Sequence, residues 1–227
     1  MVKAVFIDID NTLLDFNKCA ELSMRKCFEK FGLHFTNEVF PTFKRINDGL
    51  WRDIEKKTLT RKKLHEIRWN LIFSELKIDF DGKVMESQFL ENLNYSVVPI
   101  LGAEEILAYL SSKYEVYTVS NAPLEQQKKR LKASGFDKYL KKAFISQEIG
   151  YDKPDKRFFD ACFKEASHLK VDDVILIGDS ISADILGGKN YGLKTVWFNF
   201  EKIIGKTCVA DFTINNLLEI IDGDLNK

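Results

Sequence analysis

The feature that most constrains this chain is an apolar run that leads directly into two acidic residues. Residues 5–7 are Val-Phe-Ile, and Asp8 and Asp10 follow with a single isoleucine between them. A short run of β-branched and aromatic residues predicts a buried strand. Burying an unpaired carboxylate is costly, so the two acids require counter-charges or a metal ion. The segment therefore predicts a divalent cation site at the end of a strand.

Composition limits the classes to which the chain can belong. It has 227 residues, of which 45% are hydrophobic, enough for one large domain or a main domain with a smaller insert. The 34 basic and 34 acidic residues balance, which argues against a nucleic-acid binder. No apolar stretch approaches the roughly 20 residues that span a bilayer, and the N-terminus leads into a strand instead of a signal peptide. We expect a cytoplasmic protein with no nucleic-acid or membrane partner, and the sequence indicates no particular oligomeric state.

The cysteines and histidines follow no metal-binding or disulfide pattern. The sequence contains no CxxC pair and no HExxH motif, and its cysteines are too sparse for a disulfide scaffold. A reducing compartment fits this usage. We expect packing roles for the four cysteines, which are Cys19, Cys27, Cys162 and Cys208.

Residues 17–96 are predicted to be helical. Apolar residues recur there at three- and four-residue spacing, for example Phe43, Ile46 and Leu50, which is the pattern of one buried helix face. Thr60 is a candidate N-cap for the helix that follows it. The aromatic residues on these faces are expected to form the core of an inserted domain. Helices are predicted over residues 18–31, 40–54, 60–72 and 83–93.

From Pro99 onward, strand and helix patterns alternate. Strands are predicted over residues 114–119, 143–146, 174–177 and 195–198. Helices are predicted near residues 102–112, 123–134, 155–168, 180–190 and 214–222. Such alternation predicts an α/β fold with a Rossmann-like, doubly wound parallel sheet and helices on both faces. Residues 1–16 and 97–227 are expected to form this core domain, with residues 17–96 inserted into it.

Polar side chains gather at one predicted edge of this sheet, the carboxyl ends of the strands, where ligands bind in such folds. Carboxylates there suit a hard cation such as Mg²⁺, and a nearby lysine indicates an anionic substrate. Together they predict phosphoryl chemistry, which depends on positioning and charge neutralisation. The absence of GxxxxGK[ST] and GxGxxG motifs argues against P-loop and dinucleotide sites. The residues expected at this edge are Asp8, Asp10, Ser120, Asn121, Lys153 and Asp179.

Four short motifs lie at the predicted strand ends. They are Asp8-Ile9-Asp10-Asn11-Thr12, Ser120-Asn121, Lys153-Pro154 and Gly178-Asp179-Ser180-Ile181-Ser182-Ala183-Asp184. In this order they resemble the motifs of the haloacid dehalogenase-like hydrolase superfamily. The resemblance spans the chain, and it implies that residues 17–96 are the helical cap domain of that superfamily.

This resemblance implies a role for each acidic residue of the motifs. Asp8 would be the nucleophile that attacks phosphorus and forms an aspartyl-phosphate. Asp10 would be the general acid and base, which protonates the leaving alcohol and then activates water. Mg²⁺ would be bound by the Asp8 carboxylate, the Asp10 main-chain carbonyl and Asp179. Asp184 would act as a ligand through water or as a support behind the ligands.

The resemblance also implies a phosphate site. Ser120, Asn121 and Lys153 would bind the phosphoryl oxygens, and Lys153 would screen the nucleophile from the incoming anion. Thr12 is assigned to the same set. Purely structural roles stay open at this stage, because Thr12 could cap the turn after the first strand, and Ser120 or Asn121 could cap the next helix.

The acid at position 10 distinguishes reaction classes. A dehalogenase of this superfamily lacks an acid two residues after the nucleophile, because halide leaves without protonation. Asp10 therefore favours a hydrolase of phosphate esters. A phosphomutase shares the motifs and stays an alternative, as does a ligand-binding or regulatory protein that keeps the fold without turnover.

The cap selects the substrate in this superfamily. Residues 47–51, 59–60 and 184–199 resemble the pyrimidine 5'-nucleotidase branch, which dephosphorylates nucleoside 5'-monophosphates. Two residues depart from common patterns: Ala122 stands where a glycine often follows the Ser/Thr-Asn motif, and Lys156 where many relatives carry a second proline. The expected partner is a small phosphorylated metabolite, foremost a nucleoside 5'-monophosphate, with a sugar phosphate or phosphoglycolate as the alternative.

Overall fold

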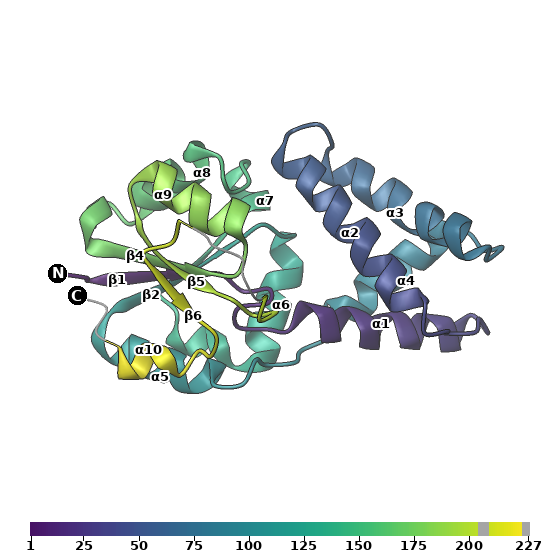
Figure 1. The fold of residues 1–227 in the computed structure, drawn as a ribbon, viewed down its shortest axis with the longest axis horizontal. Helices are drawn as coiled ribbons and strands as arrows, with labels where there is room; N and C mark the ends of the chain where they lie inside the picture. The colour runs from purple at the N-terminus through teal and green to yellow at the C-terminus, as the bar shows by residue number, and fades with distance from the viewer. Residues whose placement is uncertain (204–208, 224–227) are drawn as a thin grey trace. The chain divides into compact units, whose positions relative to one another are not determined.

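The chain forms two compact units, which the computed structural model describes for residues 1–203 and 209–223 (Figure 1). The first unit comprises residues 1–16 and 97–227, and the second comprises residues 17–96. The second unit is therefore inserted into the first. The two crossing segments are hydrogen-bonded to each other, from Asp15 N to Val98 O at 2.8 Å and from Ile100 N to Leu13 O at 3.0 Å.

The first unit is built on a six-stranded parallel sheet with the strand order β3-β2-β1-β4-β5-β6. The strands are β1 (Ala4–Ile7), β2 (Glu115–Ser120), β3 (Lys142–Ile145), β4 (Val174–Gly178), β5 (Lys194–Phe198) and β6 (Phe212–Ile214). β1 and β4 are fully buried, as expected for central strands covered on both faces. The predicted Rossmann-like α/β architecture is confirmed.

Helices cover both faces of this sheet (Figure 1). Side chains of α5 (Ala103–Lys113), α6 (Leu124–Ser134) and α10 (Glu219–Asp222) join one apolar cluster with β1 residues Val5 and Ile7. On the other face, Phe6 packs in a cluster with Phe158 and Phe159 of α8 (Lys156–Glu165). The alternation of side chains along β1 thus sends successive residues to opposite cores. The short helices α7 (Ser146–Ile149) and α9 (Gly187–Tyr191) complete this layer.

The C-terminal part of the sheet differs from the sequence-based expectation. A helix over residues 214–222 was predicted, but Phe212–Ile214 pairs with β5 as a sixth strand, and helix α10 begins only at Glu219. A three-residue edge strand offers too few positions for a period-two pattern to be recognised. The helix prediction is therefore wrong at its start, and the strand was missed.

The second unit is a bundle of four helices, close to the predicted ranges. They are α1 (Phe16–Lys30), α2 (Val39–Glu55), α3 (Arg61–Leu76) and α4 (Gly82–Leu93). Thr60 caps α3 as predicted, because its side chain accepts a hydrogen bond from Lys63 N at 3.2 Å. Among the described residues no helix combines the length and apolarity that crossing a membrane requires.

The aromatic residues of the bundle form its core, as predicted. Phe43 of α2, Trp69 of α3 and Phe89 of α4 are almost completely buried. The Trp69 and Phe89 ring centroids lie 5.6 Å apart in an edge-to-face arrangement, and those of Phe43 and Phe89 lie 5.4 Å apart. Such contacts add to the stabilisation from buried area. These side chains therefore hold α2, α3 and α4 together and are not a ligand surface.

A buried ion pair crosses the same bundle. Arg68 of α3 donates two hydrogen bonds to Glu86 of α4, at 2.6 and 3.1 Å, and one to Asn47 of α2, at 2.8 Å. The side chains of Arg68 and Glu86 are 3% and 6% exposed, so water cannot replace either partner. Burial alone would raise the pKa of Glu86, but the Arg68 charge and the hydrogen bonds from His65 and Arg68 outweigh it and lower that pKa. Glu86 therefore stabilises the folded bundle in its ionised form.

The described cysteines have the packing role predicted for them. Cys19 and Cys27 of α1 and Cys162 of α8 are buried free thiols. Burial raises the pKa of Cys27 to about 11, so this thiol stays protonated and unreactive at neutral pH. Cys208 lies outside the described residues.

Replacing Glu86 should lower stability in a pH-dependent manner. A carboxylate whose pKa is depressed in the folded state stabilises it above its ordinary pKa, which is near 4.5, and loses that effect as the pH falls below it. Glu86→Gln should lower the free energy of unfolding by about 3 kcal/mol at pH 7. Urea denaturation at pH 7 and pH 3.5 should show the difference from wild type shrinking at the lower pH. Glu91→Gln, an exposed carboxylate on the same helix, is the control, and a gap independent of pH would contradict the assignment.

Candidate active site

The acidic motifs lie where the order of strand addition reverses. β1 pairs with both β2 and β4. The chain adds β2 and β3 on one side of β1 and then crosses to add β4, β5 and β6 on the other, so the boundary between β1 and β4 is the topological switch point at which α/β folds bind ligands. The register pairs Ile7 with Ile177, and Asp8 N donates to Ile177 O at 2.9 Å. Asp8 and Asp179 therefore follow the ends of two adjacent strands.

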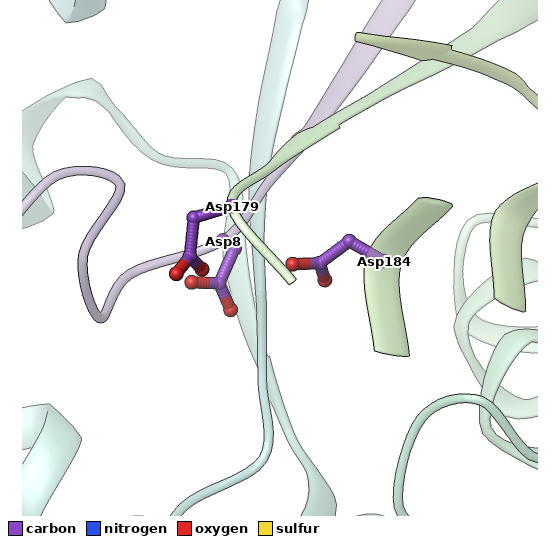
Figure 2. A group of neighbouring side chains, drawn as sticks. All are labelled: Asp8, Asp179 and Asp184. Carbon is purple, nitrogen blue, oxygen red and sulfur yellow. The ribbon is translucent and has the colours of Figure 1, made fainter. Parts of the chain in front are cut away.

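Three carboxylates converge at this position. Figure 2 shows Asp8 and Asp179 side by side with Asp184 pointing toward them. Oxygen atoms of the three side chains all lie within 4.8 Å of one another. Asp8 and Asp184 are buried, and Asp179 is partly exposed. Clustered oxygen ligands with one partly open member form the kind of site that binds a hard divalent cation.

Lys153 is buried beside two members of this cluster. Its Nζ donates to Asp8 Oδ1 at 2.8 Å, to Asp184 Oδ1 at 2.7 Å and to the main-chain oxygen of Val119 at 2.6 Å. Burial would lower the pKa of Lys153, but the adjacent charges of Asp184 and Asp8 raise it above its ordinary value. The ammonium is therefore charged at neutral pH, and its hydrogen bonds fix the orientation of both carboxylates.

The cluster carries excess negative charge when its carboxylates are ionised. Three carboxylates and one ammonium would then leave two negative charges, which one divalent cation would neutralise. Burial raises the pKa of Asp8 to about 7, with Lys153 opposing and Asp184 reinforcing that shift. Burial and the charges of Asp8 and Asp184 likewise raise the pKa of Asp179 well above its usual range. The donor set thus fits a divalent cation in both type and charge.

Asp184 reaches the cluster through a special local backbone. Residues Ile181–Leu186 form a π-helical turn instead of the start of a regular helix, and Ser180 O accepts from both Asp184 N and Ile185 N. Asp184 Oδ2 accepts from Ser180 N at 3.1 Å. A Cβ at Gly178 would lie 2.3 Å from that Oδ2, so only glycine allows this approach. The predicted helix near 180–190 is therefore present but opens with the turn that delivers Asp184.

The Ser120-Asn121 motif is built into the site instead of capping a helix. Asn121 accepts from Lys153 N and donates to Lys153 O, both at 2.8 Å, so its side chain fixes the backbone of the lysine. Ser120 is buried at the end of β2, and its Oγ accepts from Gln127 Nε2 at 2.9 Å. The N-cap of α6 is Pro123, which provides no side-chain cap. The capping alternative is therefore wrong for both residues.

Asp10 lies in a tight turn that follows β1. Asn11 adopts a left-handed conformation with φ of 59°, which asparagine tolerates better than most residues. Main-chain N–H groups of Leu13 and Leu14 both donate to Ile9 O, at 2.9 Å. This turn takes Asp10 out of the strand, and its carboxylate is not one of the three whose oxygens lie within 4.8 Å of one another.

Two residues that contact Asp10 were not found by the sequence analysis. Gln127 and Arg130 of α6 donate hydrogen bonds to its two carboxylate oxygens, at 2.6 and 2.5 Å. They lie in the run Gln-Gln-Lys-Lys-Arg, which has the composition of an exposed helix face. Only their three-residue spacing, which places both on one side of a helix, could have indicated a shared contact.

Thr12 differs from the other residues assigned to phosphate binding in its hydrogen bonding. It is completely buried, and its Oγ1 has no hydrogen-bond partner among the described residues. Its main-chain N–H donates to Ile9 O at 3.3 Å as part of the turn. The geometry thus gives no support for contact between this hydroxyl and a substrate.

The chain matches known proteins over most of its length. Residues 2–192 match the model of the haloacid dehalogenase-like hydrolase family. The HAD-hydrolase YfnB of Bacillus subtilis is 32% identical, covering 87% of this chain and 84% of its own. A magnesium-bound crystal structure of YfnB superposes with a TM-score of 0.91 over 97% of both chains, at 31% identity.

Two further relatives carry a defined activity in their names. The pyrimidine 5'-nucleotidase PynA of Streptococcus pneumoniae is 28% identical over 98% of this chain and 96% of its own. The pyrimidine 5'-nucleotidase YjjG of Escherichia coli is 30% identical over 86% of this chain and 85% of its own. With the family model, the sheet and the carboxylate cluster in agreement, this chain is an enzyme of the haloacid dehalogenase-like hydrolase family.

Proposed function

We propose that the protein is a Mg²⁺-dependent phosphomonoester hydrolase that acts through an aspartyl-phosphate on Asp8. The observation that carries the proposal is the cluster of three carboxylates, two of which are ion-paired with the buried Lys153 ammonium. Phosphoryl transfer is catalysed mainly by positioning and by neutralising the charge of the transferred group. A cation site beside a nucleophilic carboxylate provides both.

The residues of the cluster suit distinct parts of a cation site. Asp8 and Asp179 would bind Mg²⁺ directly with the main-chain carbonyl of Asp10. Asp184 already bonds through both carboxylate oxygens, to Lys153 Nζ and Ser180 N, so it would support the site from behind or through water. The bound cation would supply charge neutralisation for the phosphoryl oxygens.

The chemical steps need a nucleophile and a proton carrier. Asp8 would form a bond from a carboxylate oxygen to phosphorus as the ester P–O bond breaks, and Asp10 would donate its proton to the departing alkoxide. Asp10 would then take a proton from water, whose oxygen attacks phosphorus and releases phosphate and the Asp8 carboxylate. The acid at position 10 makes alcohol the natural leaving group and disfavours halide.

Ser120 is the main candidate for a hydrogen bond to the phosphoryl group. Lys153 would act by its positive charge, because Asp8, Asp184 and Val119 O already take its three N–H donors. Ser120 retains its hydroxyl proton as a donor, since the bond from Gln127 uses only its acceptor side. Asn121 uses its side-chain amide on Lys153, so its contribution is to hold the lysine in place. This set is narrower than the one expected from the sequence, because the Thr12 hydroxyl, unlike the side chains of Ser120 and Lys153, makes no hydrogen bond to another described residue of the site.

Nucleoside 5'-monophosphates are the proposed substrates, with residues 17–96 acting as the cap that selects them. Support comes from the nucleotidases PynA and YjjG, to which the chain is similar over most of its length. The resemblance over residues 184–199 lends less support to this substrate, because close packing is enough to explain the glycines in that segment. A Cβ at Gly187 would lie 2.9 Å from Pro154, and one at Gly188 would lie 2.8 Å from Leu176.

Asp8→Asn should remove activity while leaving the fold intact. The amide is not a nucleophile, so kcat should fall at least about 1,000-fold. Phosphate release with Mg²⁺ should be measured on nucleoside 5'-monophosphates, hexose phosphates and phosphoglycolate, with circular dichroism as the fold check. Asp172→Asn, an exposed acid before β4, is the control. Retained turnover in Asp8→Asn would refute the nucleophile, and a higher kcat/KM for hexose phosphates or phosphoglycolate would refute the substrate class.

Thr12→Val should be nearly silent. The replacement keeps the shape of the side chain and removes a buried hydroxyl that has no partner among the described residues. We expect KM to change less than about twofold and the free energy of unfolding to stay constant or rise by about 1 kcal/mol. Ser120→Ala is the comparison, and it should raise KM because it removes a proposed phosphate contact. A rise in KM for Thr12→Val equal to that for Ser120→Ala would return Thr12 to the phosphate site.

A further inference from the structure

We propose that Gln127 and Arg130 of α6 are positioning residues that hold the Asp10 carboxylate in its working orientation and link it to Ser120. The inference rests on the proposed function, in which Asp10 is the general acid and base. It concerns residues outside the four motifs, on a helix that the sequence analysis treated as a sheet-covering element.

The geometry holds both oxygens of Asp10. Arg130 Nη1 donates to Asp10 Oδ1 at 2.5 Å, and Gln127 Nε2 donates to Asp10 Oδ2 at 2.6 Å. The same Gln127 nitrogen donates to Ser120 Oγ at 2.9 Å, which uses both of its protons. Arg130 Nη1 also donates to Gln127 Oε1 at 3.1 Å, so the two α6 side chains fix each other.

The hydrogen-bonded group has a buried part, Gln127 and Arg130, and a partly open part, Asp10. Gln127 and Arg130 are fully buried, whereas the Asp10 side chain is 26% exposed. Asp10 lies in a turn and not in a strand, so the sheet does not fix its side chain. A buried, interlocked pair on a helix therefore restricts the rotation of a partly exposed carboxylate, which is how enzymes hold a proton carrier in a productive geometry.

A purely structural reading is available, in which Asp10 only neutralises the buried Arg130. The two readings differ in how substitution affects different leaving groups. An alcohol leaving group needs a proton from Asp10, whereas p-nitrophenolate leaves without one. Because kcat/KM covers the steps up to formation of the aspartyl-phosphate, loss of proton donation lowers it selectively for esters of ordinary alcohols.

The test compares kcat/KM for a nucleoside 5'-monophosphate and for p-nitrophenyl phosphate in the full chain with Mg²⁺. Arg130→Gln should lower kcat/KM about 30- to 100-fold for the nucleoside 5'-monophosphate and less than about threefold for p-nitrophenyl phosphate. The expected loss is only part of the roughly 10²- to 10⁴-fold that a general acid contributes, because Asp10 itself is retained. Arg130→Lys, which keeps the charge without the planar fork, should recover part of the selective loss. In an Asp10→Asn background, Arg130→Gln should have no further selective effect, because the residue acts through Asp10.

Matched controls separate this role from general damage. Leu131→Ala removes a buried side chain of α6 that does not contact Asp10, and it should affect both esters equally. Lys128→Gln changes an exposed ion pair on the same helix and should affect neither. If Arg130→Gln fails to fold, Gln127→Met removes the neutral half of the contact, and it should cause the same selective loss with a raised KM for both esters.

The outcomes distinguish this inference from the function on which it rests. A selective loss in Asp10→Asn together with equal losses for both esters in the Arg130 and Gln127 variants would overturn the positioning role alone. No selective loss in Asp10→Asn would overturn the acid-base assignment of Asp10, and the inference with it. Selective losses in all three variants, absent in Leu131→Ala, are the result expected.

Discussion

The buried ammonium of Lys153 is the interaction on which the rest of the site depends. Its three N–H donors are all used, by Asp8, Asp184 and the main chain of β2. A buried lysine is costly to desolvate unless its charge is compensated and its donors are satisfied. The same contacts allow two carboxylates to lie close together, which their mutual repulsion would otherwise oppose. The lysine therefore makes an acidic cluster possible, and the cluster keeps a net negative charge when its carboxylates are ionised.

Segments far apart in the sequence contribute to keeping that ammonium in place. Asn121 fixes the lysine backbone from the end of β2, and Gly178 leaves the space into which Asp184 fits. Beside this cluster, Asp10 and Arg130 form an ion pair. In the proposed mechanism the cluster binds the cation, and Asp10 carries the proton.

The parts predicted correctly from the sequence are those whose signal is local. Buried strands such as β1 show as apolar runs, and Thr60 precedes its helix with the residue type expected of a cap. The motifs at the strand ends could be assembled because parallel strands bring their carboxyl ends to one edge. Arg130 gave no such signal, since a buried arginine inside a polar helix looks like a surface residue until its partner is known. β6 has too few residues for an alternating pattern to be recognised. The burial of Thr12 depends on the packing of the folded chain, which the neighbouring residues do not specify.

The hydrogen bonds between residues 13–15 and 98–100 have a consequence for how this chain can vary. They join the two segments that lead into and out of the helical unit, so the sheet-bearing unit is closed at that point whatever lies beyond it. The insert resembles a very long loop whose two ends are already hydrogen-bonded to each other. Lengthening such a loop costs little free energy, because the closure entropy grows only with the logarithm of its length. Helices in that segment can be exchanged, extended or lost without disturbing the register of β1 and β2. The helical unit and the carboxylate cluster are thereby placed on parts of the chain that can change independently.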